Sequence, residues 1–475
     1  MQHSETSTGD SSLPLEVPSD SLATQSKVLV TVLSAQGLPP FAKAASAPNA
    51  VTAFHVSKIR VGIIGCGRIG QVHAQNIAIR VPHAILVAVS DFIEEAAMRV
   101  AERFDVPLWY KSAEDLVHDP RVDAVVICSP TDTHAPLMKE CVRYGKHAFC
   151  EKPIALDLAT IDDALATVAQ ANADLRSLRA LPRATAMTSN NREEQAFYEF
   201  AQTEHNRRLQ RLRQSPAGIQ LMVAFQRRYD HNFQRARQTH DAGFVGRPLK
   251  LHLVSRDPAP PPIAYLQSSG GIWVDQAIHD FDMARFLLKS EAVSVFASGL
   301  ALDPAIGELG DCDHVLTQLR FANGALCVID NSRATPHQAY DQRAELFGSA
   351  GSIFVHNVHP NTNEYMDTQG VHRDKPLSFF IERYADAYLQ EMQVWVQSLV
   401  EGGASAKATS PDSSAADGLT MPIPSGFDGR IAVVMAMAAR KSFAEKRPVD
   451  IVEVDPSLAP VIRQAEQEAA SLGKQ

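Results

Sequence analysis

The sequence predicts an α/β protein in which a doubly wound parallel sheet is followed by an α+β domain with a large, mostly antiparallel open sheet. One basis for this prediction is the regular alternation of buried-strand and helix patterns between residues 58 and 171, which is typical of parallel sheets. The other is a series of strand-like segments beyond residue 290, with a hairpin turn at Asn323-Gly324. A length of 475 residues allows two or three domains.

The composition is that of an ordinary globular protein, with 45% hydrophobic and 21% charged residues. A net charge of −9 disfavours nucleic acid and anionic membranes as partners, because the protein's field would repel phosphate. The six cysteines show no CxxC spacing, which suits a reducing compartment. No apolar run reaches about 18 residues and the N-terminus lacks the order of a secretory signal, so we expect a cytoplasmic protein that acts on a small molecule.

Residues 1–57 are rich in Ser, Thr, Ala and Pro and contain no arginine. We therefore expect a mostly disordered tail and no mitochondrial presequence. Residues 27–33 (KVLVTVL) are the exception, a short β-prone run that could add one strand.

The first folded segment opens with a buried strand, the motif GCGRIG and a helix. In this order the three glycines form the GxGxxG pattern of a Rossmann dinucleotide fold. Gly65 permits the tight turn, Gly67 lets a pyrophosphate approach the backbone, and Gly70 lets the helix pack on the strand. Arg68 and Ile69 lie at the start of the helix, whose N-terminus favours the anion. We therefore expect this motif to bind the cofactor.

A second strand, AILVAVSD, ends in Asp91, at the place in the fold where a ribose-binding acid belongs. A carboxylate there accepts hydrogen bonds from both ribose hydroxyls and repels a 2′-phosphate. No arginine follows until Arg99, so the sequence favours NAD over NADP. The alternative is a solvated aspartate that merely ends a strand.

The same alternation continues to residue 150, with expected helices at 93–104, 113–117 and 136–144 and expected strands at 108–110, 124–128 and 146–150. Ser129, Thr131 and His134 lie in the segment after one of these strands, where open α/β sheets bind ligands, and we expect them on the nicotinamide side. Glu151-Lys152-Pro153 follows the next strand. Pro153 restricts the backbone of Lys152, whose cation can polarise a substrate oxygen, although most lysines are simply solvated surface residues.

The stretch from Ser268 to Leu288 carries an acid and an imidazole at helical spacing behind two glycines. We expect a helix that begins at Asp275 and buries an apolar stripe formed by Ala277, Phe281, Ala284 and Leu288. Asp275, His279 and Asp282 would then share the opposite face. This helix alone leaves two interpretations equally open. Asp275 and His279 are either a catalytic carboxylate and base, or an N-cap and its exposed partner one turn later.

Taken together, GIIGCGRIG, EKP, FQRRYD and GGIWVDQAIHDFDMARF resemble the Gfo/Idh/MocA oxidoreductases, and SRDPAPPP with YDQRAELFGSAG resembles their inositol dehydrogenase branch. The resemblance covers residues 58–170 and 218–450. It implies an NAD-binding domain followed by a domain with substrate residues and often an oligomer interface. It further implies that Lys152, Asp275 and His279 are catalytic and that the peptide after the lysine is frequently cis. Independently of the resemblance, Glu151 and Lys152 directly follow a strand, and we expect them at the ligand edge of the sheet beside the cofactor.

Two segments depart from the family pattern. Residues 172–217 interrupt the join between the domains, and we expect a surface insertion whose charged part, 192–213, is an exposed helix. Residues 402–426 are rich in Ala, Ser and Pro, and we expect a flexible loop.

The second domain is expected to span 218–450 and to open with a strand that ends at Phe225. Arg227, just beyond it, is either a substrate contact or a structural salt-bridge partner. The resemblance alone suggests that Tyr340 reaches the substrate of its own or a neighbouring subunit. Residues 311–314 (DCDH) have the wrong spacing for an ordered metal site, so we assign no metal. Expected elements of this domain and of the tail 451–475 are a helix at 232–242, a strand in LKLHLVSRDP, strands at 293–301, 314–321, 325–332, 342–348 and 352–355, helices at 381–401 and 430–445, and a helical tail.

These expectations converge on NAD-dependent oxidation of a cyclic polyol, namely myo-inositol to 2-keto-myo-inositol (scyllo-inosose). His279 would be the general base, Asp275 would bind the substrate hydroxyl or steady the imidazolium, and Lys152 would stabilise the oxyanion. We expect a homo-oligomer, either a dimer or a tetramer, with a role in inositol catabolism. The alternatives are a dehydrogenase of the same family acting on another polyol, sugar or diol, and a non-catalytic NAD-binding sensor or scaffold.

Overall fold

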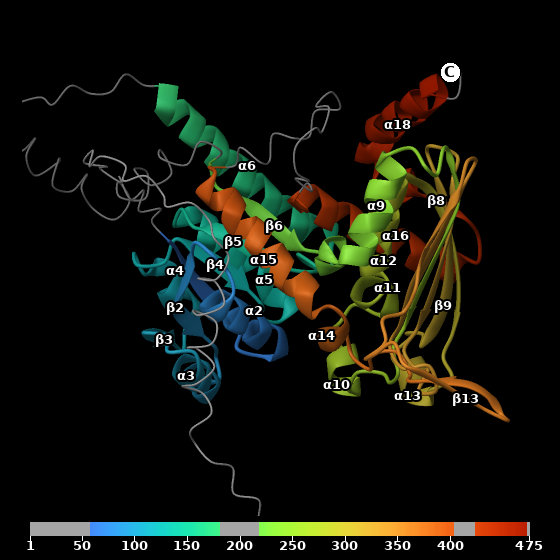
Figure 1. Ribbon diagram of the computed structural model, residues 1–475. Coiled ribbons are helices and arrows are strands. Elements are labelled where there is room, and N and C mark those ends of the chain that lie inside the picture. The colour runs from blue at the N-terminus through green and yellow to red at the C-terminus, as the bar shows by residue number, and fades with distance from the viewer. Residues whose placement is uncertain (1–57, 181–217, 403–422, 473–475) are drawn as a thin grey trace, which may run out of the picture. The chain divides into compact units, whose positions relative to one another are not determined.

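The computed structural model describes residues 58–180, 218–402 and 423–472 (Figure 1). The expected tail 1–57 with its β-prone run, the charged segment 192–213 and most of the expected loop 402–426 lie outside the described residues. No helix within the described ranges combines the length and the apolar character needed to cross a membrane. All six cysteines lie within them, and each is a free thiol.

The first sheet has six strands in the order β3-β2-β1-β4-β5-β6, and every neighbouring pair is parallel. This confirms the predicted doubly wound sheet. Its strands are β1 (Ile59–Ile64), β2 (Ala84–Ser90), β3 (Leu108–Tyr110), β4 (Ala124–Ile127), β5 (His147–Glu151) and β6 (Leu221–Ala224). The central strand β4 is fully buried because helices cover both faces of a parallel sheet.

Five helices accompany the first five strands: α2 (Arg68–Ile79), α3 (Glu94–Arg103), α4 (Ala113–His118), α5 (Thr131–Arg143) and α6 (Leu158–Ala180). Helix α5 begins earlier than predicted, because Pro136 is accommodated inside the helix rather than at its start. Helix α6 continues past residue 171 into the expected insertion. Residues 172–180 of the expected insertion are therefore part of helix α6.

Strand β6, which we expected to open the second domain, is instead the edge strand of the first sheet. It pairs in parallel with β5 over residues 148–151 and 221–224. The chain thus returns to the first sheet after residues 181–217, and only then enters the second sheet.

The second sheet has seven strands in the order β12-β11-β7-β10-β9-β8-β15. All pairs are antiparallel except β10 with β7, so the sheet is mostly antiparallel, as predicted. Its strands are β7 (Pro248–Arg256), β8 (Ala292–Leu300), β9 (His314–Phe321), β10 (Leu326–Ser332), β11 (Asp341–Gly348), β12 (Ser352–Val355) and β15 (Val449–Asp450). Gly324, at a φ of 84°, makes the predicted hairpin turn between β9 and β10.

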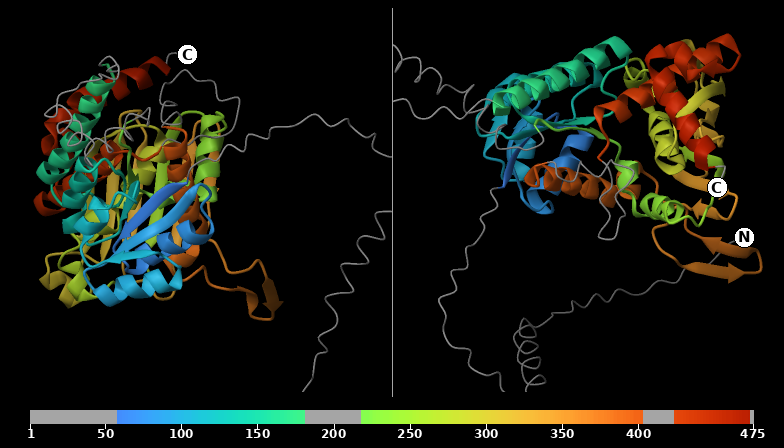
Figure 2. Two further views of the ribbon diagram at one scale, coloured as in Figure 1. Left: turned by 90° about the vertical axis from the view of Figure 1, so that its left-hand side faces the viewer. Right: turned by 90° about the horizontal axis from the view of Figure 1, so that it is seen from above.

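A further two-stranded sheet, β13 (Glu364–Asp367) with β14 (Gly370–Arg373), was not predicted. Most of its residues are exposed, including Tyr365, Met366 and Val371. Figure 2 shows this hairpin projecting away from the large sheet.

The remaining helices follow β6 along the chain (Figure 1). They are α9 (His231–Asp241), α10 (Ile263–Leu266), α11 (Ile272–Asp275), α12 (Ile278–Leu288), α13 (Pro304–Glu308), α14 (Phe380–Arg383), α15 (Ala385–Val400), α16 (Gly426–Glu445), α17 (Ile451–Val454) and α18 (Ala459–Leu472), with short 3₁₀ turns at Gln226–Tyr229 (η1) and Pro456–Leu458 (η3). Helix α15 packs against α2, and the ring of Trp395 from α15 packs at a tilted angle against Phe149 of β5, with ring centroids 5.4 Å apart. Helix α16 contacts both β6 and β8 and so joins the two sheets.

Candidate active site

The glycine-rich loop at the start of α2 has the shape needed to receive a dinucleotide. Gly65 has a φ of 94°, and a Cβ there would lie 2.6 Å from the backbone of Cys128. A Cβ on Gly70 would lie 1.8 Å from the carbonyl oxygen of Gly65. At Gly67, by contrast, a Cβ would meet nothing within 4 Å, and this residue begins α2 without a side-chain cap. Open space therefore lies beside uncapped N–H groups, as a pyrophosphate requires.

The carboxylate of Asp91 lies directly beside this loop. Its Oδ2 accepts a 2.7 Å hydrogen bond from the backbone N–H of Cys66, and its Oδ1 accepts a 2.9 Å bond from that of Ile93. These bonds hold the carboxylate at the end of β2, and the side chain remains partly exposed. The position is consistent with the predicted ribose contact.

The segment after β4 differs from the predicted loop, because α5 begins at Thr131. The hydroxyl of Ser129 lies 2.6 Å from that of Thr133, and both Ser129 and Thr131 are partly exposed. His134 is almost fully buried, with its ring nitrogens 2.8 Å from the carbonyl oxygens of Pro153 and Ser129. His134 therefore ties two loops together, and its position does not support the predicted role as a cofactor contact.

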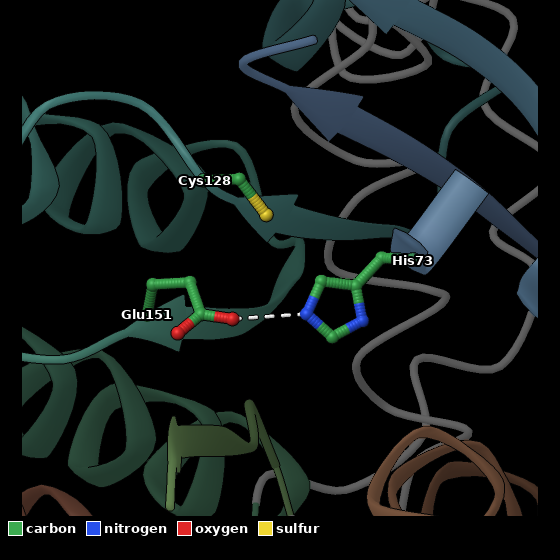
Figure 3. Close-up of side chains that lie close together, drawn as sticks. All are labelled: His73, Cys128 and Glu151. Carbon is green, nitrogen blue, oxygen red and sulfur yellow. Dashed lines mark hydrogen bonds and ion pairs between the residues drawn. The ribbon is translucent and has the colours of Figure 1, made fainter. Parts of the chain in front are cut away.

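Glu151, at the end of β5, faces a buried histidine. Oε1 of Glu151 lies 2.9 Å from Nε2 of His73 on α2, and Figure 3 shows the two groups pointing toward each other with Cys128 nearby. The ligand atoms of these three residues lie within 4.8 Å of one another, and such a set is of the type that binds zinc. We assign no metal, because the histidine and the carboxylate are already joined. The expected absence of a metal stays a prediction.

A second carboxyl group adjoins this pair. Glu391 of α15 is fully buried, and neither of its oxygens has a hydrogen-bond partner among the described residues. Burial and the neighbouring Glu151 raise the pKa of Glu391 well above its ordinary value. Glu391 therefore keeps its proton to a higher pH than an ordinary glutamate does.

Lys152 reaches across from the first sheet to the helix that carries Asp275. The peptide between Lys152 and Pro153 is cis, as the family resemblance implied. The Lys152 ammonium donates a 2.6 Å hydrogen bond to the main-chain carbonyl of Asp275 and lies 3.5 Å from Oδ1 of its carboxylate. The structure thus brings together a lysine and an aspartate from two distant segments.

The predicted single helix around these residues is two helices. Gly270 and Gly271, with φ of 86° and 84°, precede the one-turn helix α11, which ends at Asp275. Helix α12 starts at Ile278, and its apolar stripe is buried as predicted. The break at residues 276–277 means that Asp275 is the last residue of one helix, rather than the N-cap or first residue of a longer one.

His279 lies in the first turn of α12 and is partly exposed, while its Nδ1 is buried without a hydrogen-bond partner among the described residues. Its ring packs edge-on against Phe225 at 6.3 Å. Burial, together with the positive charges of Lys152 and Arg227, holds the pKa of His279 well below its ordinary value. The imidazole is therefore neutral at physiological pH, as a proton acceptor must be.

Asp282, which we placed on the same face as Asp275 and His279, does not join them. It is buried and accepts a 2.7 Å hydrogen bond from Nε of Arg228. Most of helix α12 is buried, so its two acids on the side away from the apolar stripe, Asp280 and Asp282, also lie in the interior and pair with arginines. Asp282 therefore serves the core rather than the site.

Arg227 is buried beneath the site, where its Nη1 donates to Ser255 at 2.8 Å and to Asp280 at 2.7 Å. This position corresponds to the structural salt bridge that we considered as the alternative to a substrate contact. Tyr340 is also buried and packs edge-on against Tyr384 at 6.1 Å. Both residues stay near enough to the site to influence Asp257 electrostatically.

Three residues of the site were missed by the sequence analysis. Tyr265 donates a 2.7 Å hydrogen bond to Oδ1 of Asp275, and Nη2 of Arg333 donates a 3.3 Å bond to Oδ2 of the same carboxylate. Burial raises the pKa of Asp257 to about 7, and the negative charge of Asp275 contributes. Asp257 and Arg333 each follow a strand end, which was the signal that could have revealed them.

Comparisons with known proteins decide the family. A family model described as an oxidoreductase family with an NAD-binding Rossmann fold matches residues 59–177, and one described as the GFO/IDH/MocA C-terminal domain matches residues 233–354. The myo-inositol 2-dehydrogenase of Thermotoga maritima is 38% identical over 397 residues, which cover 83% of this chain and 99% of that protein. The chain belongs to the Gfo/Idh/MocA oxidoreductase family.

Other members agree with this assignment. An inositol 2-dehydrogenase of Rhizobium meliloti is 36% identical over 394 residues, covering 83% of this chain and 99% of that protein. Among solved structures, a probable dehydrogenase from Thermotoga maritima has a TM-score of 0.68 at 38% identity, covering 83% of this chain and all of that one. A myo-inositol dehydrogenase from Corynebacterium glutamicum has a TM-score of 0.66 at 31% identity, covering 83% of this chain and 98% of that one.

As a member of the Gfo/Idh/MocA family, the protein is an NAD-dependent dehydrogenase. The residues present fit NAD, since the loop is open at Gly67 and a carboxylate lies at the end of β2. The predicted family, fold class, cofactor and enzyme class are therefore confirmed.

Proposed function

We propose that the protein oxidises a secondary hydroxyl group of a cyclic polyol, with myo-inositol as the substrate and 2-keto-myo-inositol as the product. The observation that carries the proposal is the meeting of Lys152 with Asp275 one turn before a neutral His279. Removing a hydride from carbon also requires taking a proton from oxygen, and these groups supply that function. The names of the relatives from Thermotoga maritima and Rhizobium meliloti support inositol as the substrate.

The chain's own residues divide the work. His279 accepts the hydroxyl proton, and its neutral imidazole is ready to do so without first losing a proton. Lys152 stabilises the negative charge that develops on the substrate oxygen, because its ammonium lies 3.5 Å from the Asp275 carboxylate that binds the same hydroxyl. Asp275 accepts a hydrogen bond from the hydroxyl and orients it. NAD would be held by the glycine-rich loop and Asp91 and would supply the nicotinamide ring that takes up the hydride.

Two alternatives remain to be separated by experiment. A dehydrogenase of another polyol, sugar or diol would use the same three residues and differ in the groups around them. A non-catalytic sensor would bind NAD without turnover, and the intact set of Lys152, Asp275 and His279 disfavours it.

The test is NADH formation, followed by absorbance, with myo-inositol, scyllo-inositol and glucose as substrates. We expect turnover with myo-inositol and a lower kcat/KM for the other two. Turnover with glucose alone would favour a dehydrogenase of the same family that acts on another sugar. NAD binding without turnover on any polyol would favour the sensor.

We also propose that the protein is a homo-oligomer, dimeric or tetrameric, that works in the cytoplasm in inositol catabolism. The support for assembly is the outward face of the second sheet, where paired strands expose large apolar side chains: Phe296, Leu316, Leu326, Val328 and Phe354. Exposed apolar patches of this kind usually mark contacts between proteins. Light scattering coupled to gel filtration measures the number of subunits directly, and a monomer at micromolar concentration would refute the assembly.

A further inference from the structure

Asp275 is held in place by a buried arginine to which the proposed chemistry gives no role. Arg333 directly follows β10, and only 1% of its side-chain surface is exposed. Its Nη2 donates to Oδ2 of Asp275 at 3.3 Å, while its Nη1 lies 3.5 Å from Oδ2 of Asp311. One guanidinium therefore bridges two carboxylates from different segments.

The second carboxylate anchors the start of the same short helix. Oδ1 of Asp311 accepts a 2.9 Å hydrogen bond from the backbone N–H of Ile272, the first residue of α11. Asp275 is the last residue of α11. The bridge from Asp311 through Arg333 to Asp275 thus joins the two ends of one helical turn.

Helix α11 needs such support because a single turn is not stable by itself. The first turn of a helix fixes several backbone angles for one hydrogen bond, so isolated turns are unfavourable. Gly271 approaches Asp311 closely, since a Cβ there would lie 3.1 Å from its Oδ1. The glycine and the acid therefore fit together at the start of the turn, and the arginine closes the other end.

The charges around Asp275 give the bridge a second effect. The groups that face its carboxylate are Lys152, Tyr265 and Arg333, and the buried carboxyl of Asp257 is near enough for the two acids to repel. Arg333 also lowers the proton affinity of Asp257. Removing the guanidinium would leave two acids close together with one cation fewer.

We propose that Arg333 is a positioning residue of the dehydrogenase reaction, which aims the Asp275 carboxylate at the substrate hydroxyl by bridging it to Asp311. The inference rests on the proposed function and names a residue that this function did not include. An arginine suits the task because its planar guanidinium presents several N–H groups in a fixed arrangement, whereas a lysine ammonium is a point charge.

The kinetic test compares Arg333→Met, Arg333→Lys and Asp311→Asn with the unchanged protein at saturating NAD and polyol. We expect Arg333→Met to lower kcat at least tenfold, with the KM for NAD within twofold, and to move the acid limb of the kcat profile to higher pH. Arg333→Lys loses the planar guanidinium, so it should lower kcat. It keeps the positive charge, so the acid limb of the kcat profile should stay in place. If the two residues act as one unit, the double variant Arg333→Met with Asp311→Asn should lower kcat no more than Arg333→Met alone does.

Arg285→Met is the matched control. Arg285 is also a largely buried arginine that bridges two carboxylates, Glu291 at 2.7 Å and Asp428 at 2.9 Å, but it has no ion pair with the proposed catalytic groups. We expect it to lower the melting temperature and to leave kcat per folded molecule within twofold. If Arg333→Met shows the same pattern as this control, with an unmoved acid limb, the proposal is overturned.

Amide hydrogen exchange tests the bridge without any substrate. Arg333→Met should speed exchange in residues 272–276 at least fivefold, and Arg285→Met should not. Faster exchange with unchanged kcat would overturn the positioning role, and unchanged exchange would overturn the bridge. Absence of turnover in the unmodified protein would refute the proposed function, and the exchange result would then decide on the bridge by itself.

Discussion

The ammonium of Lys152 donates a 2.6 Å hydrogen bond to the main-chain carbonyl of Asp275, although 123 positions separate the two residues in the chain. This bond joins the end of β5 in the first sheet to the end of α11. A cation that follows the first sheet and an acid from α11 therefore meet at one point.

Replacing Lys152 by methionine should lower kcat by roughly 10² to 10³, because the developing oxyanion loses its cation. The KM for NAD should change less than kcat, since the pyrophosphate and ribose contacts remain. Steady-state kinetics at saturating polyol measure both values. Lys152→Arg, which keeps the positive charge, should retain more activity than Lys152→Met, and the reverse order would contradict the assigned role.

His279→Ala should lower kcat by about 10² to 10⁴, the usual contribution of a general base. NAD binding, measured by fluorescence titration, should persist, because the imidazole belongs to the substrate side. The exposed His337 offers a control, and His337→Ala should leave kcat within twofold. Near-normal turnover of His279→Ala would refute the assignment.

Asp91→Ala should relax the preference for NAD over NADP, because the carboxylate that repels a 2′-phosphate is gone. The change should also weaken NAD binding, since Asp91 holds the backbone N–H of Cys66 in the glycine loop. The ratio of kcat/KM for the two cofactors measures the effect. Glu95→Gln, on the exposed side of α3, should not alter that ratio, and an unchanged ratio in Asp91→Ala would count against the ribose contact.

Asp257 should make the protein less stable as the pH rises toward 8. Burial raises the pKa of Asp257 in the folded protein to about 7, above the ordinary value of 3.8 that applies in the unfolded chain. The folded state therefore binds the proton more tightly, and this contribution is complete below pH 4 and is lost as the pH rises through 7. Its upper limit is about 4 kcal/mol, because one unit of pKa corresponds to about 1.4 kcal/mol.

Asp257→Asn removes this titration. The free energy of unfolding of the variant, minus that of the unmodified protein, should therefore be larger at pH 8 than at pH 5. Urea unfolding at the two pH values measures the difference in the free energy of unfolding. Glu308→Gln, at an exposed position, should show no such difference. Equal pH dependence with and without Asp257 would mean that this carboxyl is ionised in the folded state.

The first sheet could be predicted almost strand by strand, because buried parallel strands and their helices have distinct periodicities. Its last strand could not. Strand β6 follows residues 181–217 in the chain, so proximity in sequence suggested that it belonged with the second domain, whereas its hydrogen bonds go to β5. The hairpin β13–β14 was missed for a different reason, since its exposed residues show no alternation between buried and exposed positions.

The residues proposed as catalytic could be named from the sequence because they lie within motifs, but the groups that hold them could not. Asp257 and Arg333 follow the ends of β7 and β10, the one parallel pair of the second sheet, in which Arg256 lies opposite Ser332. The strand-like segments suggested mostly antiparallel neighbours and gave no reason to place those two ends side by side. Likewise, a helical pattern continues through residues 276–277, and only the structure reveals that the chain breaks there.

The place of β6 at the rim of the first sheet has a practical consequence for anyone who wishes to dissect this enzyme. A fragment that stopped before residue 218 would leave the main-chain groups of β5 without their outer partner and would strip Trp395 from Phe149. Such a truncated fragment should be poorly folded and prone to aggregate through the unpaired edge of β5. The cofactor-binding unit is thus completed by residues that come much later in translation, and its assembly has to await the synthesis of helix α15.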